Sequence, residues 1–85
     1  MEIVLSPEAL EDLQLWKQSG NTKIQNKITQ LLESIQRTPF EGIGKPEALK
    51  HNYSGYWSRR INKEHRLIYK IENERIIIVQ MRDHY

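Results

Sequence analysis

The sequence predicts an α+β fold in which two antiparallel helices pack on one face of a small antiparallel sheet. Apolar residues recur at helical spacing in the first half of the chain and alternate at strand spacing in the second half. Turn-forming residues separate the segments. With 85 residues, 38% of them hydrophobic, the chain suits one domain spanning residues 1–85. The expected order is βααβββ, with room for one more strand.

The first half of the chain is expected to hold a short strand and two helices. Residues 1–5 contain β-branched side chains and predict a strand, and Ser6-Pro7 is typical of a helix start. Gly20 stops this helix, a second begins near Thr22, and Pro39 prevents it from continuing. The two apolar stripes are Ala9, Leu10, Leu13 and Trp16, and then Ile24, Ile28, Leu31, Leu32 and Ile35.

The second half is expected to be a long loop followed by three strands. Residues 40–52 show no regular period and include two glycines and a proline. Strands are expected at residues 56–61, 65–71 and 75 to about 82, and the apolar run at 76–79 indicates a central position for the last one. Alternation predicts a helix-facing set of Leu67, Tyr69, Ile71, Ile77, Val79 and Met81. The opposite, more polar face would carry Arg66, Ile68, Lys70, Gln80, Arg82 and His84.

Positive charge and aromatic residues are concentrated in residues 45–66. This segment contains six of the thirteen Lys and Arg residues and only two carboxylates, although the formal net charge of the chain is +2. A basic stretch with interleaved tyrosine and tryptophan indicates a phosphate-rich partner such as RNA.

Several classes of protein are disfavoured by composition. The chain has no cysteine, which argues against disulfides and thiolate metal sites and favours a reducing compartment. Its longest apolar run, at residues 76–79, is far shorter than the roughly 20 residues of a membrane span. The acidic N-terminal segment is unlike a signal peptide. We therefore expect a cytoplasmic protein with no membrane partner.

Glu47, Arg66 and His84 form a candidate set for cleaving RNA without a metal ion. A carboxylate such as Glu47 can accept the proton of a ribose 2′-OH as that oxygen attacks the adjacent phosphate. The Arg66 guanidinium can stabilise the extra charge of the transition state, and His84 can protonate the leaving 5′-oxygen. Residue types alone also fit a plain surface for all three side chains.

Four ordered motifs help to decide between a catalytic site and a plain surface. They are T-P-F-E-G-x-G-K-P-E-x-L-K-H at residues 38–51, S-G-x-W-S-R-R-I at 54–61, E-H-R-L-x-Y at 64–69, and a terminal H-Y at 84–85. The chain resembles the YoeB (Txe) family of bacterial toxins, in the RelE/ParE superfamily, over almost its whole length. Tyr53 and Tyr56 are conservative departures from the family pattern.

The resemblance implies a RelE-like fold and the toxin half of a bacterial type II toxin–antitoxin system. The implied activity is ribosome-dependent cleavage of mRNA in the A site, with no cofactor and with a YefM-like antitoxin as inhibitor. It assigns Glu47 as general base, Arg66 as phosphate stabiliser and His84 as general acid. Positions associated with substrate binding or site shape are Lys50, His51, Arg60 and Tyr85. Whether the free toxin forms a homodimer stays open.

Two other functions remain as alternatives. One is a catalytically silent toxin of the same fold that acts by binding the ribosome or gyrase, and the other is a plain RNA-binding module. Arg59 and Arg60 should point to opposite faces of their strand, so Arg59 is interpreted as a structural or ribosome contact. Trp57 is interpreted as a core residue, and His65 as a poor candidate for a metal ligand.

Overall fold

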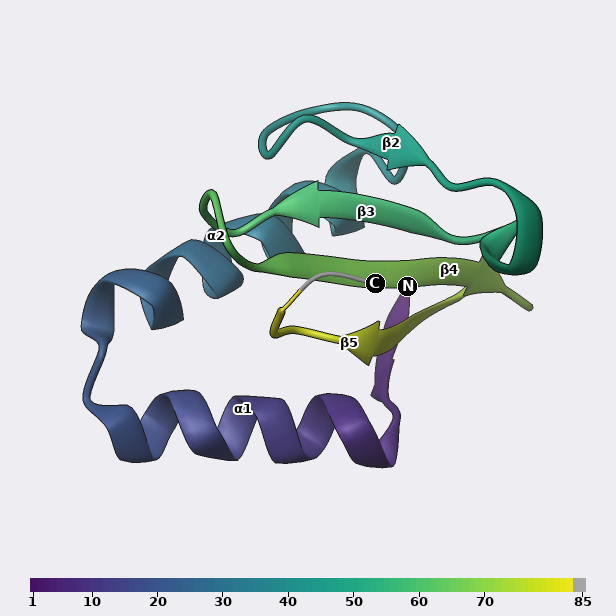
Figure 1. The fold of residues 1–85 in the computed structure, drawn as a ribbon. Helices are drawn as coiled ribbons and strands as arrows, with labels where there is room; N and C mark the ends of the chain where they lie inside the picture. Colours follow the sequence, from purple (N-terminus) through teal and green to yellow (C-terminus); the bar gives the residue numbers. More distant parts are fainter. Residues whose placement is uncertain (84–85) are drawn as a thin grey trace.

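Residues 1–83, the part of the chain that the computed structural model describes, form two helices and a five-stranded sheet (Figure 1). The predicted order of elements is confirmed, with the additional strand. The helices are α1 (Pro7–Ser19) and α2 (Thr22–Arg37). The strands are β1 (Glu2–Leu5), β2 (Glu47–Ala48), β3 (Trp57–Arg60), β4 (Arg66–Glu72) and β5 (Arg75–Gln80), and a 3-10 turn spans His51–Tyr53.

Both helices begin and end at the predicted signals. The Ser6 hydroxyl accepts the Ala9 N–H at 3.0 Å, and the Asn21 side chain accepts the Ile24 N–H at 3.1 Å. These caps satisfy backbone donors that have no partner within a helix. Gly20, with φ of 71°, ends α1 in the left-handed region. Within residues 1–83, neither helix is long and apolar enough to cross a membrane.

The sheet is mixed rather than wholly antiparallel. Its strand order is β1-β5-β4-β3-β2, and β1 runs parallel to β5 while the other three neighbouring pairs are antiparallel. The expected central position of the last strand is confirmed, because β5 lies between β1 and β4. Part of the expected loop is instead the short edge strand β2.

A bulge in β5 corrects the predicted faces of that strand. Tyr69 pairs with Ile78, but Ile68 pairs with Gln80, so Val79 is an extra residue on β5. An extra residue shifts the alternation of side chains between faces. The prediction that Ile77 and Val79 face the helices was therefore wrong; the fully buried β5 side chains are Ile76 and Ile78, followed by Met81 after the bulge.

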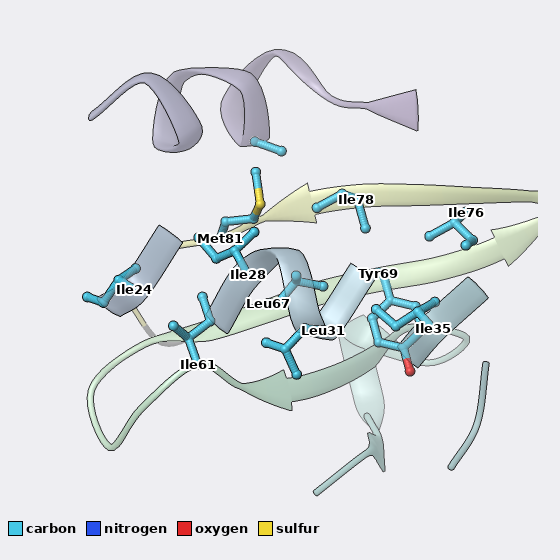
Figure 2. Close-up of a cluster of buried hydrophobic side chains, with 11 residues drawn as sticks. Ile24, Ile28, Leu31, Ile35, Ile61, Leu67, Tyr69, Ile76, Ile78 and Met81 are labelled. Atoms are coloured by element: carbon cyan, nitrogen blue, oxygen red, sulfur yellow. The ribbon is translucent and has the colours of Figure 1, made fainter. Parts of the chain in front are cut away.

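The core lies between the helices and the helix-facing side of the sheet. Figure 2 shows the side chains of α2 facing those of β4 and β5. The predicted α2 stripe is confirmed, since Ile24, Ile28, Leu31 and Ile35 are buried and Leu32 packs against them. In α1, Ala9 is buried, but Leu10 is 46% exposed and was wrongly expected in the core. The buried α1 position that the stripe did not include is Asp12, whose carboxylate accepts the Met81 N–H at 2.9 Å.

Candidate functional site

The candidate site lies on the open face of the sheet, away from the helices. The register places Glu47, Ser58, Ile68 and Gln80 side by side in one row across four strands. Residues paired across antiparallel strands point to the same face, so these four side chains share it. Ser58 and Ile68 are buried and form the floor of the row, whereas Glu47 is exposed.

Arg60 and Arg66 occupy the next row of the same face. They pair with each other across β3 and β4, two residues along from Ser58 and Ile68. Two strand spacings of about 4.8 Å and one two-residue step of about 6.7 Å separate the Glu47 and Arg66 Cα atoms by roughly 12 Å. No ion pair links Glu47 to either arginine within residues 1–83. Their long side chains can therefore approach a group held between them.

The Arg66 side chain is anchored by the turn between β3 and β4. Its Nη1 donates hydrogen bonds to the carbonyl oxygens of Asn62 at 2.8 Å, Lys63 at 3.3 Å and His65 at 3.1 Å. The Asn62 side chain in turn accepts the backbone N–H groups of Glu64 and His65. Among the described residues, Nε and Nη2 of Arg66 have no hydrogen-bond acceptor. The guanidinium is thus fixed on one side and able to bind an anion with the other.

Asp83 lies beside Arg66. The Arg66 N–H donates to the Asp83 carbonyl at 3.0 Å, and Gln80 Nε2 donates to the Arg82 carbonyl at 2.7 Å. The Asp83 N–H donates to Nδ1 of His65 at 2.8 Å, which requires that nitrogen to be unprotonated. No pattern in the sequence indicated this role of His65. His84 and Tyr85, both predicted site residues, lie outside the described residues.

Lys50 and His51 are not brought beside Arg66. Both residues follow β2 in the chain and lie beyond the N-terminal end of β3. This follows because Ala48 pairs with Trp57, the first residue of β3, and the Leu49 N–H donates to the Tyr56 carbonyl. Arg60 and Arg66 lie at the other end of these strands. Both Lys50 and His51 are exposed, so a polymer lying along the strands could contact both ends.

Lys70 also lies on the open face, but its charge is paired. Its ammonium is 2.8 Å from the Glu72 carboxylate and 5.2 Å from the centre of the Tyr56 ring. The hydrogen bond with Glu72 raises the pKa of Lys70 and lowers the pKa of Glu72. Because both groups are solvent-exposed, the pair adds little stability. Arg60 and Arg66, in contrast, have no carboxylate partner among residues 1–83.

The site is an open surface rather than an enclosed cavity. A hollow of about 450 Å³ lies between the start of α2 and residues 61–62, and its lining includes neither Glu47 nor Arg66. Within residues 1–83, no three His, Asp or Glu side chains are grouped so that they could hold a metal ion. The ring centres of Trp16 and His65 are 4.8 Å apart in an edge-to-face arrangement, so His65 packs against an aromatic side chain. An exposed acid on the same face as the anchored Arg66 guanidinium suits an extended, phosphate-bearing chain.

Comparisons with known proteins match this chain to one family of toxins. A family described as "YoeB-like toxin of bacterial type II toxin-antitoxin system" matches residues 5–85. Toxin YoeB of Escherichia coli K12 is 46% identical over 85 residues, which is 100% of both chains. A YoeB/ParE toxin structure from Agrobacterium tumefaciens is 39% identical, with a TM-score of 0.96 and 100% coverage of both chains.

Two solved structures from Staphylococcus aureus are also similar. One is a heterotetrameric YoeB–YefM toxin–antitoxin complex, whose matching chain is 48% identical with a TM-score of 0.90. The match covers 100% of this chain and 98% of that one. The other is a YoeB dimer, also 48% identical, with a TM-score of 0.91 and the same coverage of both chains.

Proposed function

The chain belongs to the YoeB family, the toxins of bacterial type II toxin–antitoxin systems, and from that premise we propose that it is an mRNA endonuclease acting at the ribosomal A site. The observation that carries the proposal is the register of the open face. It places an exposed carboxylate, Glu47, near two arginines, Arg60 and Arg66, that have no carboxylate partner among the described residues.

The proposed reaction is a transfer of the phosphate to the neighbouring 2′-oxygen. The Glu47 carboxylate takes the proton from the ribose 2′-OH, and the bond from O2′ to phosphorus forms as the bond from phosphorus to O5′ breaks. Arg66 holds the non-bridging phosphate oxygens through the N–H groups that face away from the turn. A protonated His84 gives its proton to O5′. The products are a 2′,3′-cyclic phosphate and a 5′-hydroxyl end.

The hydrogen bonds of Asp83 favour a role for His84 in the reaction. Asp83, the residue before it, is bound through its carbonyl to the Arg66 N–H and through its N–H to His65. We propose that Arg60 binds a neighbouring phosphate from the same row as Arg66. The other proposed substrate contacts are Lys50, His51 and Tyr85.

A YefM-like antitoxin is the proposed inhibitor. Arg60 and Arg66 would attract an acidic segment, and α1 exposes the apolar side chains of Leu10 and Leu15, which a partner segment could cover. We expect the antitoxin to pack against the helices and reach the open face. A structure of the complex that left Arg60 and Arg66 uncovered would contradict this. Sedimentation of the free chain would show whether it also forms a dimer.

Mapping of messenger ends in a translation extract tests the activity. The wild-type chain should produce new ends within the A-site codon, while Glu47→Ala and His84→Ala should each reduce cleavage about 10²–10⁴-fold. Translation arrest without new ends would favour a toxin that acts only by binding.

Sulfur substitution separates the roles of the acid and the base. A 5′-thio leaving group needs no proton, so it should rescue His84→Ala and leave Glu47→Ala slow. The pH profile of the wild type should be bell-shaped, and each substitution should remove one limb. Rescue of Glu47→Ala instead would reverse the assignment.

A further inference from the structure

Arg59 is a fully buried arginine that has no carboxylate partner within residues 1–83. It lies on β3 beside Arg60 but faces the helices, where its exposed fraction is 0%. Its five hydrogen bonds all go to neutral oxygen atoms. Nε donates to the Tyr69 hydroxyl at 3.1 Å, Nη1 to Ser34 Oγ at 2.7 Å and the Ile43 carbonyl at 3.1 Å, and Nη2 to the carbonyls of Thr38 at 2.7 Å and Glu41 at 2.8 Å.

These bonds use every N–H group of the guanidinium. A buried charge is tolerated only where its donors are satisfied, so the five acceptors must stay in place for the fold to hold Arg59. Three of them are backbone carbonyls of residues 38–43, a segment without helix or strand structure. Arg59 therefore fixes the path of the loop that leads from α2 to β2.

Neighbouring contacts hold the same loop from both sides. The Tyr69 hydroxyl, which accepts from Arg59, donates to the Pro39 carbonyl at 2.6 Å. The Arg60 N–H donates to the Gly44 carbonyl at 2.7 Å. A Cβ atom on Gly42 would lie 2.5 Å from Ser34 Oγ and 3.1 Å from Nη1 of Arg59, so the backbone passes close to the buried guanidinium.

The fixed loop delivers Glu47 to the open face. Only Lys45 and Pro46 separate Gly44 from Glu47, which then pairs with Ser58. β2 has two residues and lies at the edge of the sheet, so its own pairing with β3 is short. We propose that Arg59 is a positioning residue for RNA cleavage, acting through the loop to hold Glu47 in register with Arg60 and Arg66. This rests on the proposed function, in which Glu47 is the base.

Hydrogen exchange tests the positioning without requiring activity. In Arg59→Lys, one ammonium with three N–H groups replaces five donors in a planar fork, so the loop should loosen while the core remains folded. The Arg60 amide, which bonds Gly44, and the Leu49 amide, which bonds Tyr56, should exchange at least about tenfold faster, with the protection of β4 and β5 unchanged. Arg37→Lys, at an exposed arginine that ends α2, is the matched control and should change neither amide.

Cleavage on programmed ribosomes tests whether the positioning acts through Glu47. Arg59→Lys should lower kcat about 10–100-fold with a smaller change in KM, because it displaces the base while Arg60 and Arg66 stay in place. In a Glu47→Ala background the same substitution should cause no further loss. A merely structural role would lower kcat by the same factor in both backgrounds.

Each outcome decides the proposal. Unchanged protection of the Arg60 amide in Arg59→Lys, or an equal loss of kcat with and without Glu47, overturns it. If Arg59→Lys does not fold, Tyr69→Phe removes one bond to Arg59 and one to Pro39 and is judged by the same two measurements. If the wild type cleaves no RNA, the proposed function fails, and the exchange data alone decide whether Arg59 holds the loop.

Discussion

Replacing Gly44 with alanine measures how closely the loop before β2 packs against α2. Gly44 has φ of 81°, and a Cβ atom there would lie 2.6 Å from Cδ2 of Leu31 and 3.2 Å from the Arg60 carbonyl. Gly20, which ends α1, has φ of 71°, and a Cβ atom there would meet nothing within 4 Å. The two substitutions share a backbone cost and differ in steric contact, so Gly20→Ala is the matched control.

The structure gives different magnitudes for the two variants. Left-handed backbone costs an alanine about 1–2 kcal/mol, and this is the whole expected effect of Gly20→Ala. Leu31 is fully buried and cannot move into solvent, so Gly44→Ala should lose about 1–3 kcal/mol more through overpacking. The combined loss of about 2–5 kcal/mol is a large part of the 5–15 kcal/mol that typically stabilises a domain. It should lower Tm by about 10 °C or more, since each kcal/mol shifts Tm by roughly 4–8 °C at this size.

Urea unfolding followed by circular dichroism provides the assay. Gly44→Ala should have a clearly lower midpoint than Gly20→Ala, while both keep the wild-type m-value, which would show that the surface exposed on unfolding is unchanged. Equal losses of stability in the two variants would contradict this prediction, because the contact with Leu31 would then carry no cost.

Three further predictions follow from other parts of the molecule. Burial raises the pKa of Tyr69 above its ordinary value of 10.0, against a smaller opposing effect of Arg59. Because the unfolded chain loses this proton at a lower pH than the folded chain, the stability should hold below about pH 10 and fall as the pH rises further. Tyr69→Phe should remove this pH dependence of the urea midpoint. Asp12→Ala leaves the Met81 N–H without its acceptor and should cost about 1–3 kcal/mol in thermal unfolding; an equal loss in Asp12→Asn, whose side-chain oxygen can still accept, would contradict this account. A net charge of +2 is small for holding free RNA, so naked RNA should be cut far more slowly than mRNA on programmed ribosomes; similar rates would remove the argument for a ribosomal scaffold.

Much of the candidate site followed from alternation along the strands. The pattern predicted that Arg66 lies on the polar face and that Arg59 and Arg60 point in opposite directions, and both predictions are confirmed. Glu47 was proposed from its residue type and expected in the loop before the strands, and the register of β2 places it on the same face as Arg66. The part of the site that depends on His84 and Tyr85 stays a prediction.

Both helices could be predicted from the sequence because their causes are local. Ser6 and Asn21 cap their helices within three residues, and the apolar stripe of α2 repeats at the helical period, so neighbouring residues specify both helices. Three features could not be predicted from the sequence: the parallel pairing of β1 with β5, the extra residue at Val79 and the surroundings of Arg59. Each of these depends on groups far apart in the chain: the five acceptors of Arg59 come from α2, the loop before β2, and β4. Alternation gives the face of a side chain within one strand, but the strand's partner, direction and register are set by which distant groups can be buried and hydrogen-bonded together.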